Sequence, residues 1–275
     1  MRFILLGNAS RCGVLDAVER LRPDIQRCGE IVFEDFTGNK DASQIEADLA
    51  VVFGGDGSIL RAVNQMGTKQ IPVLAVQLGT LSFLSTIQAD DLPDLLQRSD
   101  LLTLPVIEHL LLECTLYREG DNKPVNSYLA LNEIAVQGRT GSRLIGIELF
   151  ADGGFVSEFH GDGLLLSTPV GSTAHNLSAG GPILRKDINA VVLTPLSPHT
   201  LSIRPLVDSP DRKFEFRIKH KGILIIDGTE ITEMNAGDSV IATRAKAVFK
   251  TVDVPGYCYY RILRNKLGWN GNVIS

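Results

Sequence analysis

The sequence predicts an α+β fold of two domains: an N-terminal α/β domain with a parallel sheet and a C-terminal domain that is mostly β structure. Its first hundred residues alternate short apolar runs with amphipathic stretches, which is the pattern of βαβ units. From about residue 104, Gly, Pro and Asn separate runs of alternating polarity, as in β domains. A length of 275 residues suits two domains. We therefore expect domains at residues 1–103 and 104–254, with a tail at 255–275 that can complete the first.

The elements of the first domain follow from its apolar patterns. Four short apolar runs predict strands at residues 3–6, 31–36, 49–53 and 73–76. The pattern over 14–21 predicts a helix that ends at Pro23, because proline lacks the N–H that a helix interior needs. A second helix is predicted from Ser58 to about Met66, where Gly67 closes it.

The elements of the second domain are shorter and lie between turn residues. Four alternating runs predict strands at residues 110–117, 144–150, 214–218 and 223–226. In the tail, residues 259–266 followed by Gly268 predict a short helix that can close on either domain. The sequence has no internal repeat and no low-complexity linker.

Composition excludes several classes of protein. Hydrophobic residues make up 44% of the chain and charged residues 21%, which is the balance of a packed globular enzyme. The net charge is −5 and no basic cluster is present, so we expect no nucleic-acid partner. The apolar run before Asn8 is too short for a signal peptide or a membrane span, so we expect a cytoplasmic protein with no membrane partner. The four cysteines lack metal-ligand spacing and predict reduced thiols.

A glycine-rich loop joins the apolar strand at 49–53 to the helix after it. Glycines let backbone N–H groups approach an anion closely, and a helix start adds unpaired N–H groups and a favourable dipole. The loop has neither the lysine of a P-loop nor a GxGxxG spacing, which excludes both of these nucleotide-binding loops. The candidate ligands for the phosphate donor in this loop are Gly54, Gly55, Gly57 and Ser58.

Asp56 sets this loop apart from a plain phosphate-binding turn. A phosphate repels a carboxylate among its amide donors unless the carboxylate serves a metal ion or accepts a hydroxyl proton. Asp56 is therefore the candidate general base or magnesium ligand. A tight turn in which Asp56 caps the following helix would explain the same tetrapeptide.

The loop resembles the GGDG loop shared by NAD kinases, by diacylglycerol and sphingosine kinases and, more distantly, by phosphofructokinases. A second segment chooses among them. Gly161-Asp162-Gly163 leads to STPVGSTAHNLSAGGP at residues 167–182, whose small hydroxyl residues and glycines suit a polar ligand, although turns between strands have a similar composition. This segment closely resembles the NAD kinase signature GDG…STPTGSTAYxLSAGGP, which the lipid kinases do not share. The resemblance covers nearly the whole chain and is weakest at residues 8–48.

The resemblance implies a set of residues that bind NAD. Asn132 and Glu133 match an Asn-acid pair that would hold ribose hydroxyls, and Arg143 matches an arginine that lines the site. Phe83, in a segment similar to the family's LGxLGFL loop, would lie against the nucleotide. A strand-end turn, a solvated arginine and a core phenylalanine are the ordinary alternatives. The full implied set is Asp56, Gly57, Phe83, Asn132, Glu133, Arg143, His160, Asp162, Thr173, Ala174, His175, Asn176, Leu177 and Ser178.

Two positions depart from the family pattern. His160 stands where many relatives have arginine, and His175 replaces the usual tyrosine. Both histidines lie in the strongest motifs, so the resemblance does not determine which contacts these two residues make with the nucleotide. Later matches complete the resemblance and are interpreted as mainly structural, with Asp227 to Thr229 expected near the nucleotide and Lys266 to Trp269 as the usual ending.

The resemblance implies an NAD kinase, which phosphorylates the 2′-hydroxyl of the adenosine ribose of NAD to give NADP. Asp56 would be the general base. Arg61, one helical turn later, is expected to reach the phosphates of ATP or another donor such as polyphosphate, and a helix arginine that faces water is the ordinary alternative. Mg²⁺ or another divalent ion would bridge those phosphates, with no metal ligand assigned in the protein. The family also implies a homodimer or homotetramer. The alternatives are a GGDG-type lipid kinase and a non-catalytic NAD(P)-binding sensor.

Overall fold

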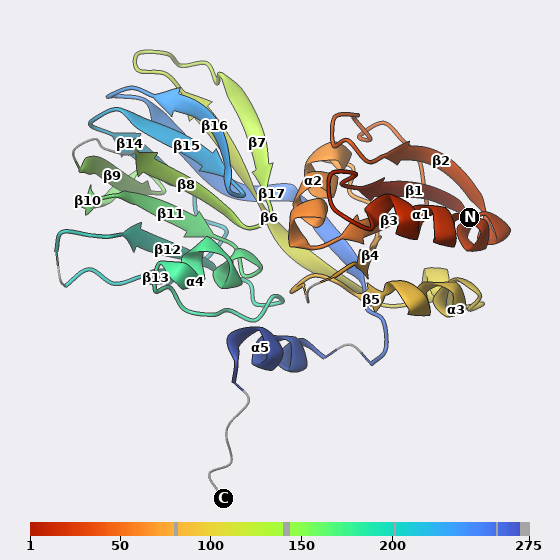
Figure 1. The fold of residues 1–275 in the computed structure, drawn as a ribbon. Coiled ribbons are helices and arrows are strands. Elements are labelled where there is room, and N and C mark those ends of the chain that lie inside the picture. The colour runs from red at the N-terminus through yellow and green to blue at the C-terminus, as the bar shows by residue number, and fades with distance from the viewer. Residues whose placement is uncertain (80–81, 140–143, 201, 257, 270–275) are drawn as a thin grey trace, which may run out of the picture. The chain divides into compact units, whose positions relative to one another are not determined.

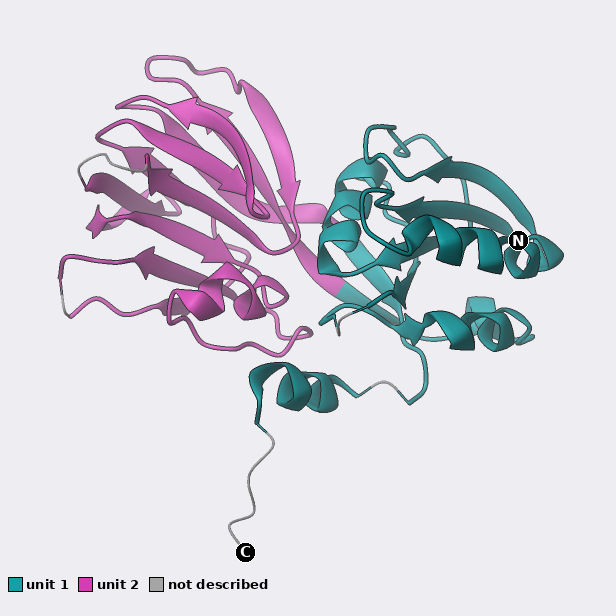
Figure 2. Cartoon of the chain, in the orientation of Figure 1, with its two compact units in different colours: residues 1–108, 249–275 teal, residues 109–248 magenta. Residues whose placement is uncertain are grey.

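The structure is a computed structural model that describes residues 1–79, 82–139, 144–200, 202–256 and 258–269 (Figure 1). The chain forms two compact units (Figure 2). Unit 1 consists of Met1–Glu108 and Phe249–Ser275, and unit 2 of His109–Val248. Two long strands, β6 (Val106–Tyr117) and β17 (Ser239–Val252), have residues in both units.

Unit 1 contains a parallel sheet with the strand order β2-β1-β3-β4. The last residues of β17 join it beside β4, where Thr251 pairs with Val73. β3 is buried along its whole length, which explains its continuous apolar sequence. The strands of unit 1 are β1 (Arg2–Gly7), β2 (Glu30–Asp35), β3 (Leu49–Gly54), β4 (Val73–Gln77) and β5 (Ile87–Gln88).

This strand order creates a crevice at one edge of the sheet. β1 connects to its neighbour β2, whereas β3, on the other side of β1, connects onward to β4. Loops that leave adjacent parallel strands in opposite directions open a space at the carboxyl ends of those strands, where α/β proteins bind ligands. The glycine-rich loop after β3 and the loop after β1 both lie at this point.

The helices of unit 1 pack their apolar sides on this sheet. Val14, Val18 and Leu21 of α1 join the core that contains Phe3 and Val51. The helices are α1 (Val14–Cys28), α2 (Asp56–Met66), α3 (Leu92–Leu96) and α5 (Tyr259–Leu267), with the short helical turns η1 (Ala89–Asp91) and η2 (Leu101–Thr103).

The prediction that Pro23 ends the first helix is wrong, because α1 continues to Cys28 with Pro23 inside it. An interior proline costs about 3 kcal/mol, since it lacks an N–H and crowds the carbonyl four residues earlier. Ile25 lies beyond the proline and is fully buried in the core, and burial of an isoleucine stabilises the folded state by about 1.5–3 kcal/mol. Packing of the second half of the helix therefore outweighs the local preference.

Unit 2 is built from two antiparallel sheets. One has the order β13-β12-β11-β8-β15-β16, and the other contains β10-β9-β14-β17, with β6 pairing with β17 and β7. Buried side chains of both sheets, such as Val136, Leu164, Ile147 and Phe216, share one core, as in a β sandwich. The remaining strands are β7 (Asn126–Ala130), β8 (Glu133–Gly138), β9 (Ile145–Ala151), β10 (Gly154–Gly161), β11 (Gly163–Ser167), β12 (Val191–Leu196), β13 (Leu206–Asp208), β14 (Phe214–Ile218), β15 (Gly222–Ile226) and β16 (Thr229–Met234).

Two short helical segments, η3 (Gly171–Thr173) and α4 (His175–Ser178), follow β11. They contain the second motif found in the sequence. A parallel α/β unit and a mostly β unit confirm the predicted fold class. In the part of the chain that the structure describes, no helix has the length and apolar character needed to cross a membrane.

Candidate active site

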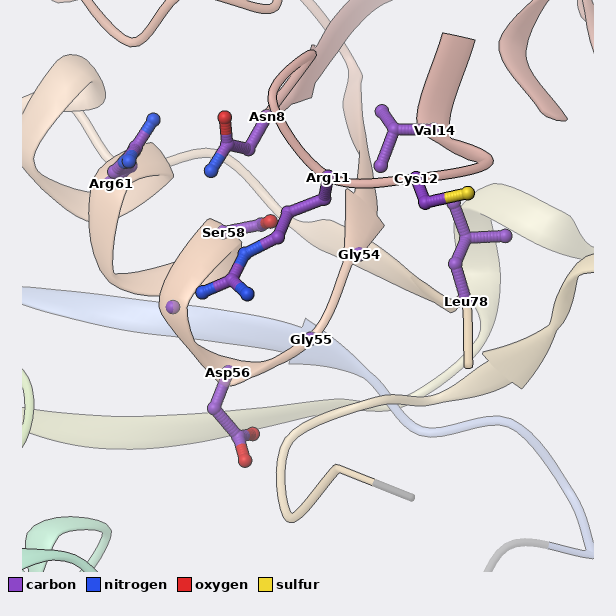
Figure 3. A pocket seen from close by; sticks show the side chains of 11 residues that line it. Asn8, Arg11, Cys12, Val14, Gly54, Gly55, Asp56, Ser58, Arg61 and Leu78 are labelled. Carbon is purple, nitrogen blue, oxygen red and sulfur yellow. The ribbon is translucent and has the colours of Figure 1, made fainter. Parts of the chain in front are cut away.

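A cavity of about 410 Å³ lies in unit 1 at the carboxyl ends of β1 and β3 (Figure 3). Its wall comes from the loops after these strands, from the start of α2 and from the residue after β4. The lining residues are Asn8, Arg11, Cys12, Val14, Gly54, Gly55, Asp56, Gly57, Ser58, Arg61 and Leu78. All four glycine-loop residues that the sequence assigns to a phosphate donor, and Arg61, therefore lie around one space.

The backbone of the glycine loop requires glycine at one position and leaves bare amides at two others. Gly54 has a φ of 137°, and a Cβ there would lie 2.3 Å from Ser58 Oγ. A side chain at this position would be strained and would collide with the start of α2. By contrast, a Cβ on Gly55 or Gly57 would meet no atom within 4 Å. The loop thus presents open backbone at the positive end of α2.

Asp56 occupies the first turn of α2, but its carboxylate does not cap the helix. Gly55 is the N-cap residue, and no side-chain hydrogen bond caps this end. The carboxylate instead accepts hydrogen bonds from the Ser82 hydroxyl, from the Phe83 N–H at 3.2 Å and from the Leu84 N–H at 3.1 Å. These donors fix the orientation of the carboxylate, while 34% of the side chain remains exposed. The helix-cap alternative does not describe this residue.

Arg11 is a cavity residue that the sequence did not single out. It follows β1, and Figure 3 shows its guanidinium beside the start of α2, with the Asp56 carboxylate directed away from it. Asn8, in the same loop, accepts hydrogen bonds from the N–H and hydroxyl of Ser10. With Arg61, the cavity contains two arginines and the bare amides of the glycine loop, which together suit a polyanion.

In unit 2, one carboxylate holds the backbone of the predicted Asn-acid pair. Asp227 accepts hydrogen bonds from the N–H groups of Leu131, Asn132 and Glu133 at 2.9, 2.7 and 3.0 Å. Burial raises the pKa of Asp227 to about 6, and these three backbone hydrogen bonds oppose the increase. Asp227 itself adopts the left-handed conformation, with a φ of 49°.

Glu133 is a buried acid beside Asp227. Burial, reinforced by the nearby charge of Asp227, raises the pKa of Glu133 to about 8, and the backbone N–H of His175 opposes this. Its Oε2 atom is buried and has no hydrogen-bond partner among the described residues. The raised pKa means that Glu133 carries a proton at neutral pH and offers a buried O–H group.

The segment of residues 167–182 uses many of its polar groups internally. The side-chain N–H₂ of Asn176 donates to the carbonyls of Ser172 and Pro182, and its Oδ1 accepts from the Thr194 hydroxyl at 2.6 Å. Asn176 is fully buried. A Cβ at Gly171 would lie 2.0 Å from the Asn132 carbonyl oxygen, so glycine permits this segment to pack on the Asn132 backbone.

The other predicted residues divide between partly exposed positions and contacts elsewhere. Thr173, Ala174, His175 and Leu177 are partly exposed, and Ser178 and Asp162 are exposed. His160 is exposed on β10 and pairs with Glu158 of the same strand at 3.1 Å. Phe83 is partly buried in unit 1, and Arg143 lies outside the described residues.

No group of three or more His, Cys, Asp or Glu side chains is arranged to hold a metal ion within the ranges that the structure describes. Asp56 is the carboxylate that lines the cavity. A divalent ion that takes one protein carboxylate and completes its shell with phosphate oxygens and waters fits this donor set, whereas a metal held only by protein ligands does not.

Two models of one family match most of the chain. The ATP-NAD kinase N-terminal domain matches residues 27–99, and the ATP-NAD kinase C-terminal domain matches residues 131–254. The chain is 42% identical over 275 residues to a protein named NAD kinase from Rhodopirellula baltica, covering 99% of this chain and 88% of that protein.

Two solved structures share the fold. Yeast NADH kinase complexed with NADH superposes with a TM-score of 0.85 at 24% identity, covering 98% of this chain and 88% of that chain. An NAD kinase from Archaeoglobus fulgidus in complex with ATP gives a TM-score of 0.76 at 23% identity, covering 98% of each chain.

Proposed function

This chain belongs to the NAD kinase family and is a phosphotransferase that acts on NAD, and from this premise we propose that Asp56 is its general base. The observation that carries the proposal is the position of the Asp56 carboxylate, which is oriented by three donors and remains one-third exposed at the glycine loop. A base needs a fixed orientation and access to the proton that it accepts.

The proposed reaction transfers one phosphoryl group to the adenosine ribose of NAD. The 2′-hydroxyl oxygen forms a bond to the γ-phosphorus of ATP or another donor, and its proton passes to Asp56. The bond between the γ-phosphorus and the oxygen that bridges it to the rest of the donor breaks. The electron pair of this bond stays on that oxygen, which leaves as part of ADP when ATP is the donor. Little covalent chemistry falls to the protein, so its contribution is positioning and neutralisation of charge.

We assign the donor phosphates to the cavity of unit 1. The amides of Gly55 and Gly57 and the side chains of Arg11 and Arg61 supply donors and positive charge there. Mg²⁺, when bound to the donor phosphates, would neutralise part of their charge, with Asp56 as the available carboxylate. The ATP named with the archaeal fold neighbour supports a nucleoside triphosphate as the donor.

We assign the dinucleotide to unit 2. The buried O–H of Glu133 and the partly exposed residues Thr173, Ala174, His175 and Leu177 offer contacts, and Asn132 and Asp162 add polar side chains. The NADH named with the yeast fold neighbour supports this class of ligand. The roles of Phe83, Arg143, His160, Asn176 and Ser178, and a homodimer or homotetramer, stay predictions.

The test is Asp56→Asn, assayed with NAD, ATP and Mg²⁺ and coupled to an NADP-specific dehydrogenase. We expect kcat to fall by roughly 10²–10⁴-fold, the usual contribution of a general base, with the KM for NAD within about twofold of wild type. Asp16→Asn is a matched control, because Asp16 is also an acid in the first turn of a unit 1 helix. A turnover of Asp56→Asn close to that of Asp16→Asn would remove Asp56 from the mechanism.

A further inference from the structure

The helix α5 carries a lysine to the proposed base. Lys266 Nζ lies 4.0 Å from Asp56 Oδ2 and 4.9 Å from the centroid of the Phe83 ring. All three residues belong to unit 1, although 210 positions separate the two charged residues in the sequence. Lys266 is 29% exposed and Asp56 34% exposed, so both groups can contact a substrate.

Lys266 and Asp56 differ from an ordinary surface ion pair because the carboxylate accepts its hydrogen bonds from other residues and not from the lysine. A direct N–H···O bond spans about 2.7–3.2 Å, so a separation of 4.0 Å leaves Lys266 close to the carboxylate without a hydrogen bond to it. The carboxylate already accepts three hydrogen bonds from residues 82–84. The ammonium group of Lys266 can therefore donate a hydrogen bond to an oxygen of a substrate that binds near Asp56.

The reaction brings such an oxygen to this place. A hydroxyl that gives its proton to Asp56 lies about 2.7–2.8 Å from the carboxylate, and the phosphoryl group in transfer is attached to that hydroxyl oxygen. The lysine side chain is flexible and ends in a compact positive charge. Its Nζ atom lies 4.0 Å from Asp56 Oδ2, so the ammonium can contact the phosphoryl oxygens of a group that is transferred beside this carboxylate. Negative charge is spread over these oxygens during transfer.

We propose that Lys266 is a second catalytic residue, whose ammonium binds the phosphoryl group during its transfer; this rests on Asp56 being the base. Lys266 keeps its proton throughout, because the hydroxyl proton goes to Asp56. The glycine loop lacks the lysine of a P-loop, and Lys266 supplies that charge from a distant part of the sequence.

Phe83 supports both groups at once. Its backbone N–H donates to Asp56 Oδ2, and its ring lies below the Lys266 ammonium at a distance within the range of a cation–π contact. Phe83, which the family resemblance places against the nucleotide, thus also contacts the base and its neighbouring cation.

The test compares Lys266→Met, Lys266→Arg and Arg264→Met in the full chain. Methionine keeps the length of the lysine stem and removes the charge, whereas arginine keeps the charge. Arg264 is an exposed cation of the same helix, two positions earlier and so on another side of it. We expect Lys266→Met to lower kcat by about 10²-fold, as loss of one donor to a developing charge does, with the KM for NAD within about twofold. Lys266→Arg should recover at least about a tenth of wild-type kcat, and Arg264→Met should leave kcat unchanged.

Each outcome decides one question. A wild-type kcat in Lys266→Met, or equal losses in Lys266→Met and Arg264→Met, would overturn the role of Lys266. A rise in KM alone would do the same, because it would indicate ground-state binding. If Asp56→Asn in the same assay retains turnover, the assignment of the base fails instead. Thermal unfolding of every variant checks folding, and Lys266→Gln replaces Lys266→Met if the methionine variant does not fold.

Discussion

The glycine loop of unit 1 and the long motif of unit 2 use the same kinds of residue for different purposes. At residues 54–58, the amides and the neighbouring arginines face a cavity. At residues 167–182, Thr168, Ser172 and Asn176 are fully buried and hydrogen-bonded within unit 2. The short loop therefore presents its polar groups to a cavity, whereas much of the longer motif stabilises its own backbone. Substitutions in the glycine loop should lower kcat. Substitutions of buried residues that hold the longer motif in place should lower the free energy of unfolding.

The strongest test of this contrast is Gly54→Ala. A Cβ at a φ of 137°, 2.3 Å from Ser58 Oγ, should displace the start of α2 and with it Asp56. We expect kcat to fall by at least about 10²-fold, because small displacements of a positioned group have effects of this size. Gly55→Ala, at an ordinary φ with open space, should leave the thermal midpoint unchanged. Steady-state kinetics and thermal unfolding of both variants give the answer; full activity in Gly54→Ala would contradict it.

Arg11→Gln should change donor binding and leave the dinucleotide unaffected. Hydrogen bonds to a charged group contribute about 1.5–3 kcal/mol, so the KM for ATP should rise by roughly 10–100-fold while the KM for NAD stays near wild type. Arg20→Gln, which removes an exposed ion pair with Asp90, is the control and should have little effect. Titration of each substrate separates the two constants. Equal changes in both KM values would show that Arg11 does not act on the donor alone.

Thr194→Val tests the unit 2 side of the comparison. The Thr194 hydroxyl donates to the buried Asn176 Oδ1, and valine of similar shape would leave that oxygen without its donor. We expect a loss of about 1–3 kcal/mol in the free energy of unfolding, measured by urea denaturation, with kcat of the folded protein within about twofold. Thr115→Val, on a partly exposed strand position, should cost less. A large fall in kcat without a loss of stability would break the contrast.

The smallest expected effect is the pH dependence contributed by Glu133. Its pKa of about 8 in the folded protein is higher than in the unfolded chain, so the folded state retains a proton that the unfolded state loses. The resulting stabilisation is present at low pH and disappears as the pH rises through about 8. Between pH 7.5 and 9, wild type should therefore lose about 1 kcal/mol of stability or slightly less relative to Glu133→Gln, which does not titrate. Denaturation curves at several pH values measure the difference, and a constant difference would contradict the raised pKa.

The sequence predicts the parts of this molecule that depend on local patterns. The apolar run at 49–53 followed by glycines gives both the strand and the loop, and Asp56 is recognisable because a carboxylate is unexpected there. The tail helix is also predicted almost residue for residue. Local patterns fail at Pro23, where the burial of Ile25 overrides a backbone preference.

The rest of the site depends on contacts between distant segments. Arg11 lies at the cavity because β1 and β3 are neighbours in the sheet. The local sequence of neither strand predicts that the two strands pair. Lys266 is found only once α5 is placed against residues 56 and 83. The family resemblance implies that Asn176 contacts the ligand, but only the fold reveals the carbonyls that its side chain binds.

Asp227 has a consequence for how a dinucleotide can be held. Three successive N–H groups that converge on one oxyanion form the kind of nest that other proteins offer to a phosphate. At residues 131–133, the nest already contains an anion that is part of the chain. These amides are therefore not open to the pyrophosphate of a dinucleotide, and in the proposed complex the contacts at this point would come from the side chains of Asn132 and Glu133, on a backbone that the Asp227 carboxylate holds in place.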